Sequence, residues 1–477
     1  MAENRKVPLE NWQNILDFCF VCAIIPCMER NLYPKLVEWK NKSRRKPLIL
    51  LGARQVGKTW LLKEFGRREY RNLVYFNCEK EDASAGKTRN DEQGKSIVED
   101  IFSSKDPHRI INRLSIHLDM DIDPEKDFIF LDEIQDYPDA LLSLKYFKED
   151  APEYHVAAAG SLLGLQIHED KGFPVGMMDI MNLYPMTFDE FLKAMGKDRL
   201  IESLETDPLS DCNAYLHKLE ELLRQYYWVG GMPEAVAEFV DTGDYREVRN
   251  IQKNILKGYE FDIGKHAEAS EVLRIKEVLN SIPAQLAKEN KKFVYGVIKG
   301  GARARTYENA INWLIDAGIL YQVFRCNVLE RPLSSSEDHS AFKLYMLDLG
   351  LLGAISNTEP SDVLVRSDSL FSSYRGAFTE QYVAEQFAAI VGPDRLYYHT
   401  NQNSTSVIDF ISEKCAVLAF EVKAETNLRA KSLSAALKKY PELKGYRYSM
   451  APYRMEERME CVPLSAVPFH LRRVFGD

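Results

Sequence analysis

The clearest chemical signature in the sequence is a segment that begins with glycine and ends in lysine and threonine. It comprises Gly52, Ala53, Arg54, Gln55, Val56, Gly57, Lys58 and Thr59, the pattern Gly-x-x-x-x-Gly-Lys-Thr of a phosphate-binding loop. The two glycines allow backbone N–H groups to point inward and form a nest for an anion. Lys58 is expected to neutralise the β- and γ-phosphates of a nucleotide, and the Thr59 hydroxyl to ligate Mg²⁺. The alternative is a chance match in a glycine-tolerant turn.

A second signal is an apolar run, residues 128–133, that ends in the two acids Asp132 and Glu133. At the carboxyl end of a strand, Asp132 is placed to hold the Mg²⁺ of the nucleotide, usually through water. Glu133 is placed to polarise the attacking water as a general base. Solvated acids at a strand end are the alternative, but a phosphate loop earlier in the same class of sheet favours the functional interpretation.

A third residue at the end of a predicted strand is Ser161, which follows the run HVAAAG. Its hydroxyl could hydrogen-bond the catalytic water or the γ-phosphate. A plain Gly–Ser turn explains the same residues equally well, so the sequence leaves both interpretations open.

Four charged residues near the C-terminus form a separate pattern. Glu380 shares the apolar face of its helix, and an inward carboxylate costs free energy unless it is paired or binds a metal. Asp409 lies in an apolar strand, and Glu421 and Lys423 lie on one face of another. Glu…Asp…Glu-x-Lys in this helix–strand–strand setting resembles the restriction-endonuclease-like PD-(D/E)xK nuclease core.

That resemblance implies that Asp409 and Glu421 hold Mg²⁺ against a scissile phosphate. It further implies that Lys423 orients or activates the water, while Glu380 completes the metal shell. Three interpretations stay open: an active nuclease, a nuclease-like domain that does not cut, and a chance pattern in which a carboxylate pairs with a lysine. Residues 421–477 carry eleven Lys/Arg and seven Asp/Glu. This excess mildly favours a phosphate-rich partner such as double-stranded DNA and is also normal for a solvated surface.

These residues need a scaffold, and the sequence predicts an α/β fold. Short apolar runs that end in polar residues alternate with helix-length stretches, a pattern typical of a parallel sheet covered on both faces. The predicted strands are 47–52, 73–77, 128–133 and 155–161. Thr187 and Glu190 form a capping box, which predicts the start of a helix. Further along, the pattern predicts a helix over 375–391 and strands near 395–400, 407–412 and 415–423.

Composition limits the possible classes of protein. The chain has 477 residues, which suggests about three domains. With 45% apolar and 28% charged residues, it is neither wholly disordered nor fibrous. Its 62 Lys/Arg and 71 Asp/Glu leave a net charge of −9, which excludes a general polyanion-coating protein.

Cysteine content and hydropathy indicate the cellular compartment in which the protein is expected. Eight cysteines are too sparse for a disulfide scaffold, so reduced thiols in the cytoplasm are expected. Cys19, Cys22 and Cys27 have no matching His or Cys pair, so no zinc site is expected. No segment reaches the ~18 uninterrupted apolar residues of a membrane span, and no membrane contact is expected. Residues 1–27 receive no functional role, with Met28 a candidate for the true start of the folded protein.

Five segments in order carry a resemblance to a known family. GARQVGKTW, FIFLDEIQ, AAAGSLLG, LYPMTFDEFL and YYWVGGMPEAV resemble the uncharacterised prokaryotic AAA-type ATPases that carry a C-terminal domain of unknown function. The resemblance runs from about residue 28 to about residue 430 and implies a P-loop core of the extended AAA+ type with ATP and Mg²⁺. The resemblance implies that Lys58 and Thr59 bind phosphate and Mg²⁺ and that Asp132 binds Mg²⁺. It also implies that Glu133 acts on the attacking water and that Ser161 acts as a sensor.

One position departs from that family. Relatives often have an arginine after the glycine of the stretch FPVGMM, where this chain has Met177. If that arginine acts on phosphate in relatives, this protein must use another, and Arg224, Arg303 and Arg305 are the alternatives. The missing arginine bears on the hydrolysis of ATP rather than on the binding of the nucleotide.

We therefore expect five regions along the chain. They are an N-terminal extension (1–27), a P-loop AAA+-like ATPase core (28–200), a helical lid region (201–290), a winged-helix-like module (291–335) and a restriction-endonuclease-like C-terminal domain (336–477). The leading hypothesis is an ATPase that switches a nuclease-like, DNA-interacting domain. Competing hypotheses are an ATP-binding regulatory or defence scaffold that engages another protein or a second copy, and a kinase-like phosphotransferase.

Overall fold

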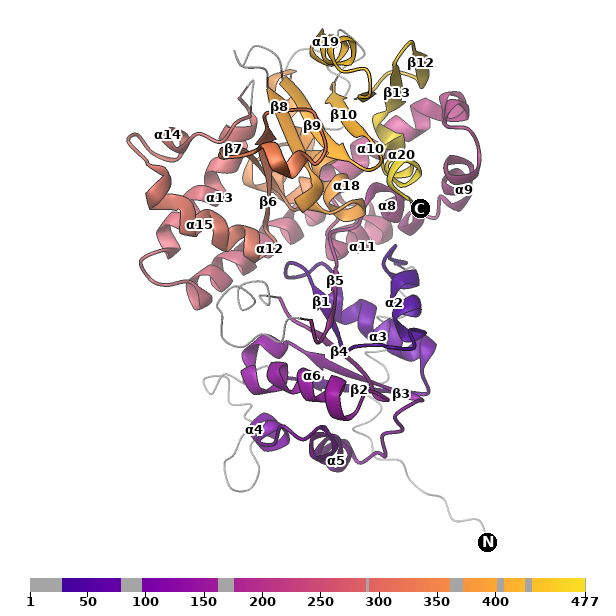
Figure 1. Cartoon of the computed structure of the whole chain (residues 1–477), viewed down its shortest axis with the longest axis vertical. Coiled ribbons are helices and arrows are strands. Elements are labelled where there is room, and N and C mark those ends of the chain that lie inside the picture. Colours follow the sequence, from indigo (N-terminus) through magenta and orange to yellow (C-terminus); the bar gives the residue numbers. More distant parts are fainter. Residues whose placement is uncertain are drawn as a thin grey trace.

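The computed structural model describes residues 28–78, 97–161, 176–288, 291–360, 372–400, 407–424 and 431–476. The prediction for residues 1–27 lies outside these ranges. Figure 1 shows a first part built around one sheet and a larger second part that holds most of the helices and another sheet. The phosphate loop lies in the first part, at the end that faces the second.

The first part contains a five-stranded parallel sheet with the strand order β2-β3-β4-β1-β5. Its strands are β1 (Leu48–Leu51), β2 (Asn72–Asn77), β3 (Asp127–Asp132), β4 (His155–Ala159) and β5 (Asp179–Asn182). Its helices are α2 (Tyr33–Lys40), α3 (Lys58–Glu69), α4 (Ile97–Phe102), α5 (Pro107–Leu118) and α6 (Pro138–Asp150). All carboxyl ends of the strands meet at one edge, and this edge carries every chemical residue predicted for the core.

Both faces of this sheet are buried, because alternate residues of each strand contribute to different cores. Leu50 and Phe130 pack in the cluster that contains Phe65 of α3. Ile49 and Ile129 belong to the other cluster, with residues of α4, α5 and α6. The expectation of an α/β fold with a parallel sheet covered on both sides is confirmed.

Helices dominate the chain that follows. They are α8 (Phe188–Ala194), α9 (Asp198–Thr206), α10 (Leu216–Val229), α11 (Pro233–Thr242), α12 (Tyr245–His266), α13 (Val272–Leu286), α14 (Tyr295–Ile298), α15 (Ala304–Asp316) and α16 (Leu349–Ile355). The predicted capping box is present at the start of α8, where Glu190 accepts the N–H of Thr187 at 2.9 Å. In α12, Asp244 caps the first turn by accepting the N–H of Arg246. Within the described ranges, no helix is long and apolar enough to cross a lipid bilayer.

The second sheet has eight strands in the order β12-β13-β11-β10-β9-β8-β6-β7. They are β6 (Leu320–Cys326), β7 (Glu337–Met346), β8 (Tyr397–Thr400), β9 (Val407–Glu413), β10 (Val417–Val422), β11 (Lys444–Ser449), β12 (Arg454–Glu456) and β13 (Met459–Pro463), accompanied by α18 (Ser372–Ile390), α19 (Lys431–Lys439) and α20 (Val467–Phe475). β6, which lies in the expected winged-helix-like module, forms a hairpin with β7 and pairs on its other side with β8. The hairpin is therefore the edge of the C-terminal sheet.

Candidate functional site

The predicted phosphate loop connects β1 to α3 and needs glycine at both of its ends. A Cβ on Gly52, whose φ is +148°, would lie 2.2 Å from the carbonyl oxygen of Leu183. Gly57 has φ +95° and immediately precedes α3, in the left-handed region that glycine tolerates. Gln55 also has a positive φ, 67°, which costs a non-glycine residue about 1 kcal/mol or more. The loop is thus held in one strained, inward-curled shape.

Lys58 lies inside this loop with only 7% of its surface exposed. Its ammonium donates to the carbonyl oxygens of Gly52 at 2.8 Å and Ala53 at 2.7 Å. Burial lowers the pKa of Lys58 to about 8, while the charges of Glu133 and Asp132 oppose that shift. A buried ammonium held only by neutral carbonyls is a strong potential partner for a phosphate oxygen.

Thr59 and Asp132 meet at the same edge of the sheet. The Thr59 hydroxyl donates to Oδ1 of Asp132 at 3.2 Å, and the Tyr75 hydroxyl of β2 donates to Oδ2 at 3.1 Å. Burial raises the pKa of Asp132, and the Thr59 hydrogen bond works against this. A hydroxyl beside a carboxylate is a donor set that suits Mg²⁺. Tyr75 was missed by sequence reasoning, because an aromatic residue in a strand carries no chemical signal of its own.

Glu133 follows β3 in the left-handed conformation, with φ 48°. Its N–H donates to Asp132 at 3.2 Å, and Gln135 donates to its Oε2 at 2.6 Å. The carboxylate is therefore oriented by a neighbouring amide. Gln135 was also not singled out from the sequence, although it belongs to the quoted segment FIFLDEIQ.

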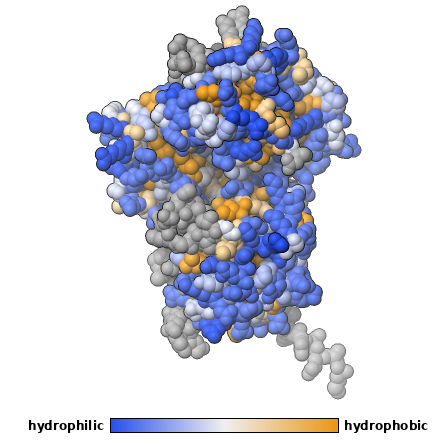
Figure 2. Space-filling view, viewed as in Figure 1, coloured by the Kyte–Doolittle hydropathy of each residue, from blue (hydrophilic) through white to orange (hydrophobic). Residues whose placement is uncertain are grey.

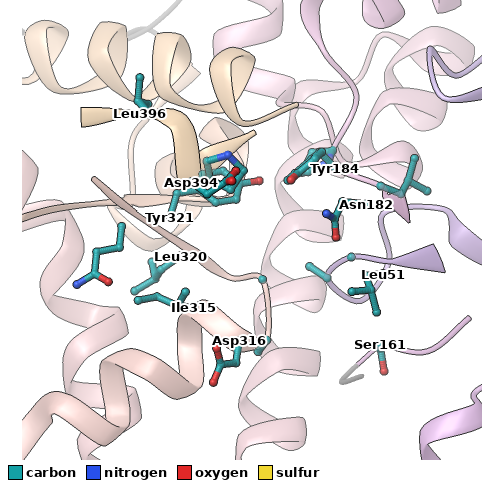
Figure 3. Close-up of a pocket in the computed structure, with 18 of the residues that line it drawn as sticks. Leu51, Ser161, Asn182, Tyr184, Ile315, Asp316, Leu320, Tyr321, Asp394 and Leu396 are labelled. Carbon is teal, nitrogen blue, oxygen red and sulfur yellow. The ribbon is translucent and has the colours of Figure 1, made fainter. Parts of the chain in front are cut away.

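A cavity of about 540 Å³ lies where the two parts of the molecule meet, with Ser161 at its border. In Figure 3, Leu51, Asn182 and Ser161 belong to the first part, while Ile315, Asp316 and Leu320 come from the end of α15 and the start of β6. The rings of Tyr184 and Tyr321 meet edge to face across this junction, with 6.1 Å between centroids. Figure 2 shows apolar residues at the surface near the junction.

The second part packs directly on the phosphate loop, which the sequence did not indicate. The Tyr259 hydroxyl of α12 donates to the carbonyl oxygen of Arg54 at 3.0 Å. Asp262, one turn further along α12, forms an ion pair with the Arg54 guanidinium. A Cβ on Gly318, just after α15, would lie 3.3 Å from the backbone nitrogen of Ala53. A change in the shape of the loop therefore displaces atoms of α12 and of the α15–β6 turn.

Two of the three arginines proposed from the sequence, Arg303 and Arg305, lie away from the loop of their own chain. Arg303 and Arg305 lie at the start of α15, whereas the opposite end of that helix reaches the loop, about 18 Å away. Arg224 lies in α10, and its charge acts on Tyr227, which packs against Tyr382 of α18.

Met177 precedes β5, whose first residue, Asp179, pairs with Leu48 at the start of β1. It lies at the amino edge of the sheet, opposite the loop that follows the carboxyl end of β1. The absence of an arginine at this position removes nothing from the phosphate site within one chain.

The C-terminal charged residues also come together, with two partners that the sequence did not indicate. Glu380 of α18 pairs with Lys291 and with Lys343 of β7, the latter at 3.3 Å, and it accepts the Tyr345 hydroxyl at 3.1 Å. Burial would raise the pKa of Glu380, but the two lysines outweigh it and lower the pKa to about 2. Glu380 is thus an ionised carboxylate whose charge is already matched.

The other three residues lie beside this ion pair. Asp409 accepts the N–H of Val422 at 2.8 Å, and its pKa is raised to about 6 by burial and by the charge of Glu380. Lys423 contacts Glu421 at 2.9 Å. Burial alone would lower the pKa of Lys423, but Asp409 and Glu421 outweigh it and raise the pKa.

Across the described ranges, no group of three or more His, Cys, Asp and Glu side chains could hold a metal ion. The roles of Glu380, Asp409 and Glu421 as metal ligands therefore stay a prediction. In this structure the charge of Glu380 is matched by Lys291 and Lys343.

Comparisons with known proteins match three segments of the chain. Residues 44–192 match the family described as an AAA domain. Residues 220–362 and 375–467 match two families described as domains of unknown function, DUF8612 and DUF4143. The first of these two runs across the predicted border at 335/336. A search of curated proteins found no match.

Solved structures of three archaeal proteins are similar to parts of the chain at 15% sequence identity. The Walker-type ATPase of Pyrococcus abyssi matches over 69% of this chain and 96% of its own, with a TM-score of 0.44. The ORC1 protein of Aeropyrum pernix, solved in complex with DNA, matches over 69% and 91% with a TM-score of 0.27. Cdc6p of Pyrobaculum aerophilum matches over 70% and 95% with a TM-score of 0.25.

The class of the first part follows from its sheet and its family match. A parallel sheet with a phosphate loop after β1 and an acidic pair after β3 is the arrangement of a P-loop ATPase core, and the segment that contains it matches the AAA domain over residues 44–192. This class binds and hydrolyses nucleoside triphosphates, usually ATP with Mg²⁺. The expected P-loop ATPase core is confirmed at the level of the fold and of the domain match.

Proposed function

We propose that the protein is a Mg²⁺-dependent ATPase whose nucleotide cycle moves its helical part and, through it, the C-terminal α/β domain. The observation that carries this proposal is the convergence of Lys58, Thr59 and Asp132, linked by the 3.2 Å Thr59–Asp132 hydrogen bond. An ammonium, a hydroxyl and a carboxylate from two different elements meet there, as triphosphate hydrolysis requires.

Each side chain has a proposed role in that reaction. Lys58 binds the β- and γ-phosphate oxygens, and Thr59 and Asp132 hold Mg²⁺, which when bound neutralises charge on the same oxygens. Glu133 accepts the proton of the water that attacks the γ-phosphorus, as the bond to the β–γ bridging oxygen breaks. Ser161, at the neighbouring strand end, contacts the γ-phosphate or that water.

Phosphate release by the purified full chain tests the assignment. Glu133→Gln should lower turnover at least about a hundredfold while ATP still binds, because it removes the base and leaves the loop intact. Lys58→Ala should lose ATP binding itself. The exposed residues Lys105 and Glu149 provide matched controls, Lys105→Ala and Glu149→Gln, that keep wild-type turnover. Wild-type turnover in Glu133→Gln or Lys58→Ala would refute the assignment.

A second proposal concerns the C-terminal domain, which could be a nuclease-like module that acts on double-stranded DNA. The order of its elements supports this: α18, the antiparallel strands β8, β9 and β10, then α19 and the parallel strand β11. Asp409 lies on β9 and Glu421 on the adjacent strand β10, with Lys423 directly after the end of β10. The alternative is a regulatory or defence scaffold whose C-terminal domain recognises DNA, another protein or a second copy without cutting.

Incubation with plasmid and Mg²⁺ or Mn²⁺ separates these alternatives. Cutting that disappears in Asp409→Ala and Lys423→Ala would support the nuclease. DNA binding without cutting would support an inert recognition domain, and neither activity would favour a protein partner. A rise in ATP turnover on addition of double-stranded DNA would connect the two parts of the chain.

A further inference from the structure

Arg54 is the one strongly basic side chain within the phosphate loop besides Lys58, and it has an unusual attachment. Its backbone carbonyl is held by Tyr259 and its guanidinium by Asp262, both on α12. The Arg54 side chain is 47% exposed, whereas the Asp262 side chain is only 10% exposed. The guanidinium is thus accessible at the loop surface, and its carboxylate partner is built into the second part of the molecule.

The charges of Arg54 and Lys58 act on each other across the loop. The positive charge of Arg54 contributes to lowering the pKa of Lys58, in the same direction as burial. Both cations are held by partners that are weaker than a triphosphate: two carbonyls for Lys58 and one carboxylate for Arg54. A guanidinium is suited to bind phosphate through two parallel hydrogen bonds.

We propose that Arg54 senses the γ-phosphate, exchanging Asp262 for the triphosphate when ATP occupies the loop and stabilising the charge that develops during hydrolysis. This inference rests on the proposed ATPase function. It assigns the arginine role to the loop of the same chain, rather than to Arg224, Arg303 or Arg305. A diphosphate lacks the group that Arg54 recognises and leaves the Arg54–Asp262 ion pair closed.

The exchange also has a route into the second part of the molecule. Toward the other end of α12, about 15 Å from Asp262, Gln252 donates to the carbonyl oxygens of Trp228 and Val229, both at 2.9 Å. There, Arg249 donates to the carbonyl oxygen of Gly350 in α16 at 3.1 Å. Release of Asp262 removes one of the two α12 contacts with Arg54, on a helix whose other half is bonded to the elements that support the C-terminal domain.

The test compares the affinities for Mg-ATP and Mg-ADP by calorimetry, in a Glu133→Gln background so that ATP is not consumed. Arg54→Gln should weaken ATP binding about tenfold and leave ADP binding within about twofold, because only the γ-phosphate contact is lost. With Glu133 restored, the same change should lower kcat by about a hundredfold or more. Arg54→Lys should not restore kcat, since an ammonium lacks the planar fork.

Asp262→Asn tests the same proposal in the opposite direction. Removing the competing carboxylate should raise ATP affinity by about three- to tenfold, as the cost of opening the ion pair disappears. Misfolding cannot produce such a gain. The control is Arg246→Gln, an exposed arginine at the start of the same helix, which should leave both affinities unchanged.

Two results would overturn the proposal while ATP binding by the parent protein stands. One is an Arg54→Gln protein with unchanged kcat and an unchanged ratio of ATP to ADP affinity. The other is an Asp262→Asn protein that binds ATP more weakly than the parent. Absence of ATP binding by the parent protein would instead overturn the proposed function itself.

Discussion

The phosphate site and the C-terminal charge cluster both bury charged side chains, but they balance them differently. At the phosphate loop, the Lys58 ammonium rests on neutral carbonyls and its pKa falls to about 8. In the C-terminal cluster, Glu380 is matched by two lysines and a tyrosine hydroxyl. A buried charge that contacts only neutral groups can bind a ligand of opposite charge. A buried charge that contacts opposite charges instead connects the elements that carry them.

The two sites also differ in how much of their surroundings the sequence indicates. Loop residues 52–59 are contiguous, so their geometry is largely set by local backbone sterics. The C-terminal set is spread over a helix and two strands, and its lysine partners come from elsewhere in the chain. The following substitutions test this difference between the two sites.

The largest effect on stability is expected for Glu380→Ala. This change removes the carboxylate that contacts Lys291 and Lys343 and leaves Asp409 as their neighbouring negative charge, which should lower the free energy of unfolding by about 3–5 kcal/mol. Urea denaturation of the full chain measures it. The triple change Glu380→Leu, Lys291→Met and Lys343→Met should recover part of the loss, because neither lysine is then left buried without the carboxylate that it contacts. A loss of under about 1 kcal/mol for Glu380→Ala alone would contradict the structural role.

The opposite sign is expected for Lys58→Met at the phosphate loop. The pKa of Lys58 lies near 8 in the folded protein, below its ordinary 10.5, so below pH 8 the native state carries the cost of a buried charge. The substitution should raise the free energy of unfolding by about 1–3 kcal/mol at pH 7.

That gain should shrink as the pH rises from 8 to 10.5, because the wild-type lysine then loses its proton and with it the cost. Urea denaturation at pH 7 and pH 10 measures both values. Lys105→Met, at an exposed position, serves as the control and should change little at either pH. A destabilised Lys58→Met protein at pH 7 would show that the carbonyl hydrogen bonds outweigh the buried charge.

A smaller effect is expected for Tyr75→Phe, which removes one hydrogen bond to Asp132. Stability should fall by about 1 kcal/mol, and Mg-ATP affinity should change by about two- to fivefold at most. Calorimetric titration of the nucleotide at fixed Mg²⁺ measures the second quantity. A complete loss of ATP binding would mean that Tyr75 positions Asp132 far more strongly than one neutral hydrogen bond can.

Much of the first part could be predicted from the sequence, because its signals are local. The run LILL ahead of Gly52 predicted β1, the acids after residue 131 marked the end of β3, and Thr187 with Glu190 predicted the start of α8. Each signal depends on neighbours within a few residues. The winged-helix-like module expected at 291–335 illustrates the limit, because a strand such as β6 is locally encoded while its pairing with β8 is not.

The sequence by itself determined the phosphate loop, the acidic pair at the neighbouring strand end and the parallel sheet that carries them. The glycines, the lysine and the alternating apolar residues set the local backbone conformation and the buried face of each strand. Both depend on residues that are close together in the sequence. Tertiary structure alone decided that Asp262 holds Arg54 across 208 positions, and that Lys291 and Lys343 neutralise Glu380. Ion pairs of this kind depend on which distant elements pack together, and no local spacing encodes that choice.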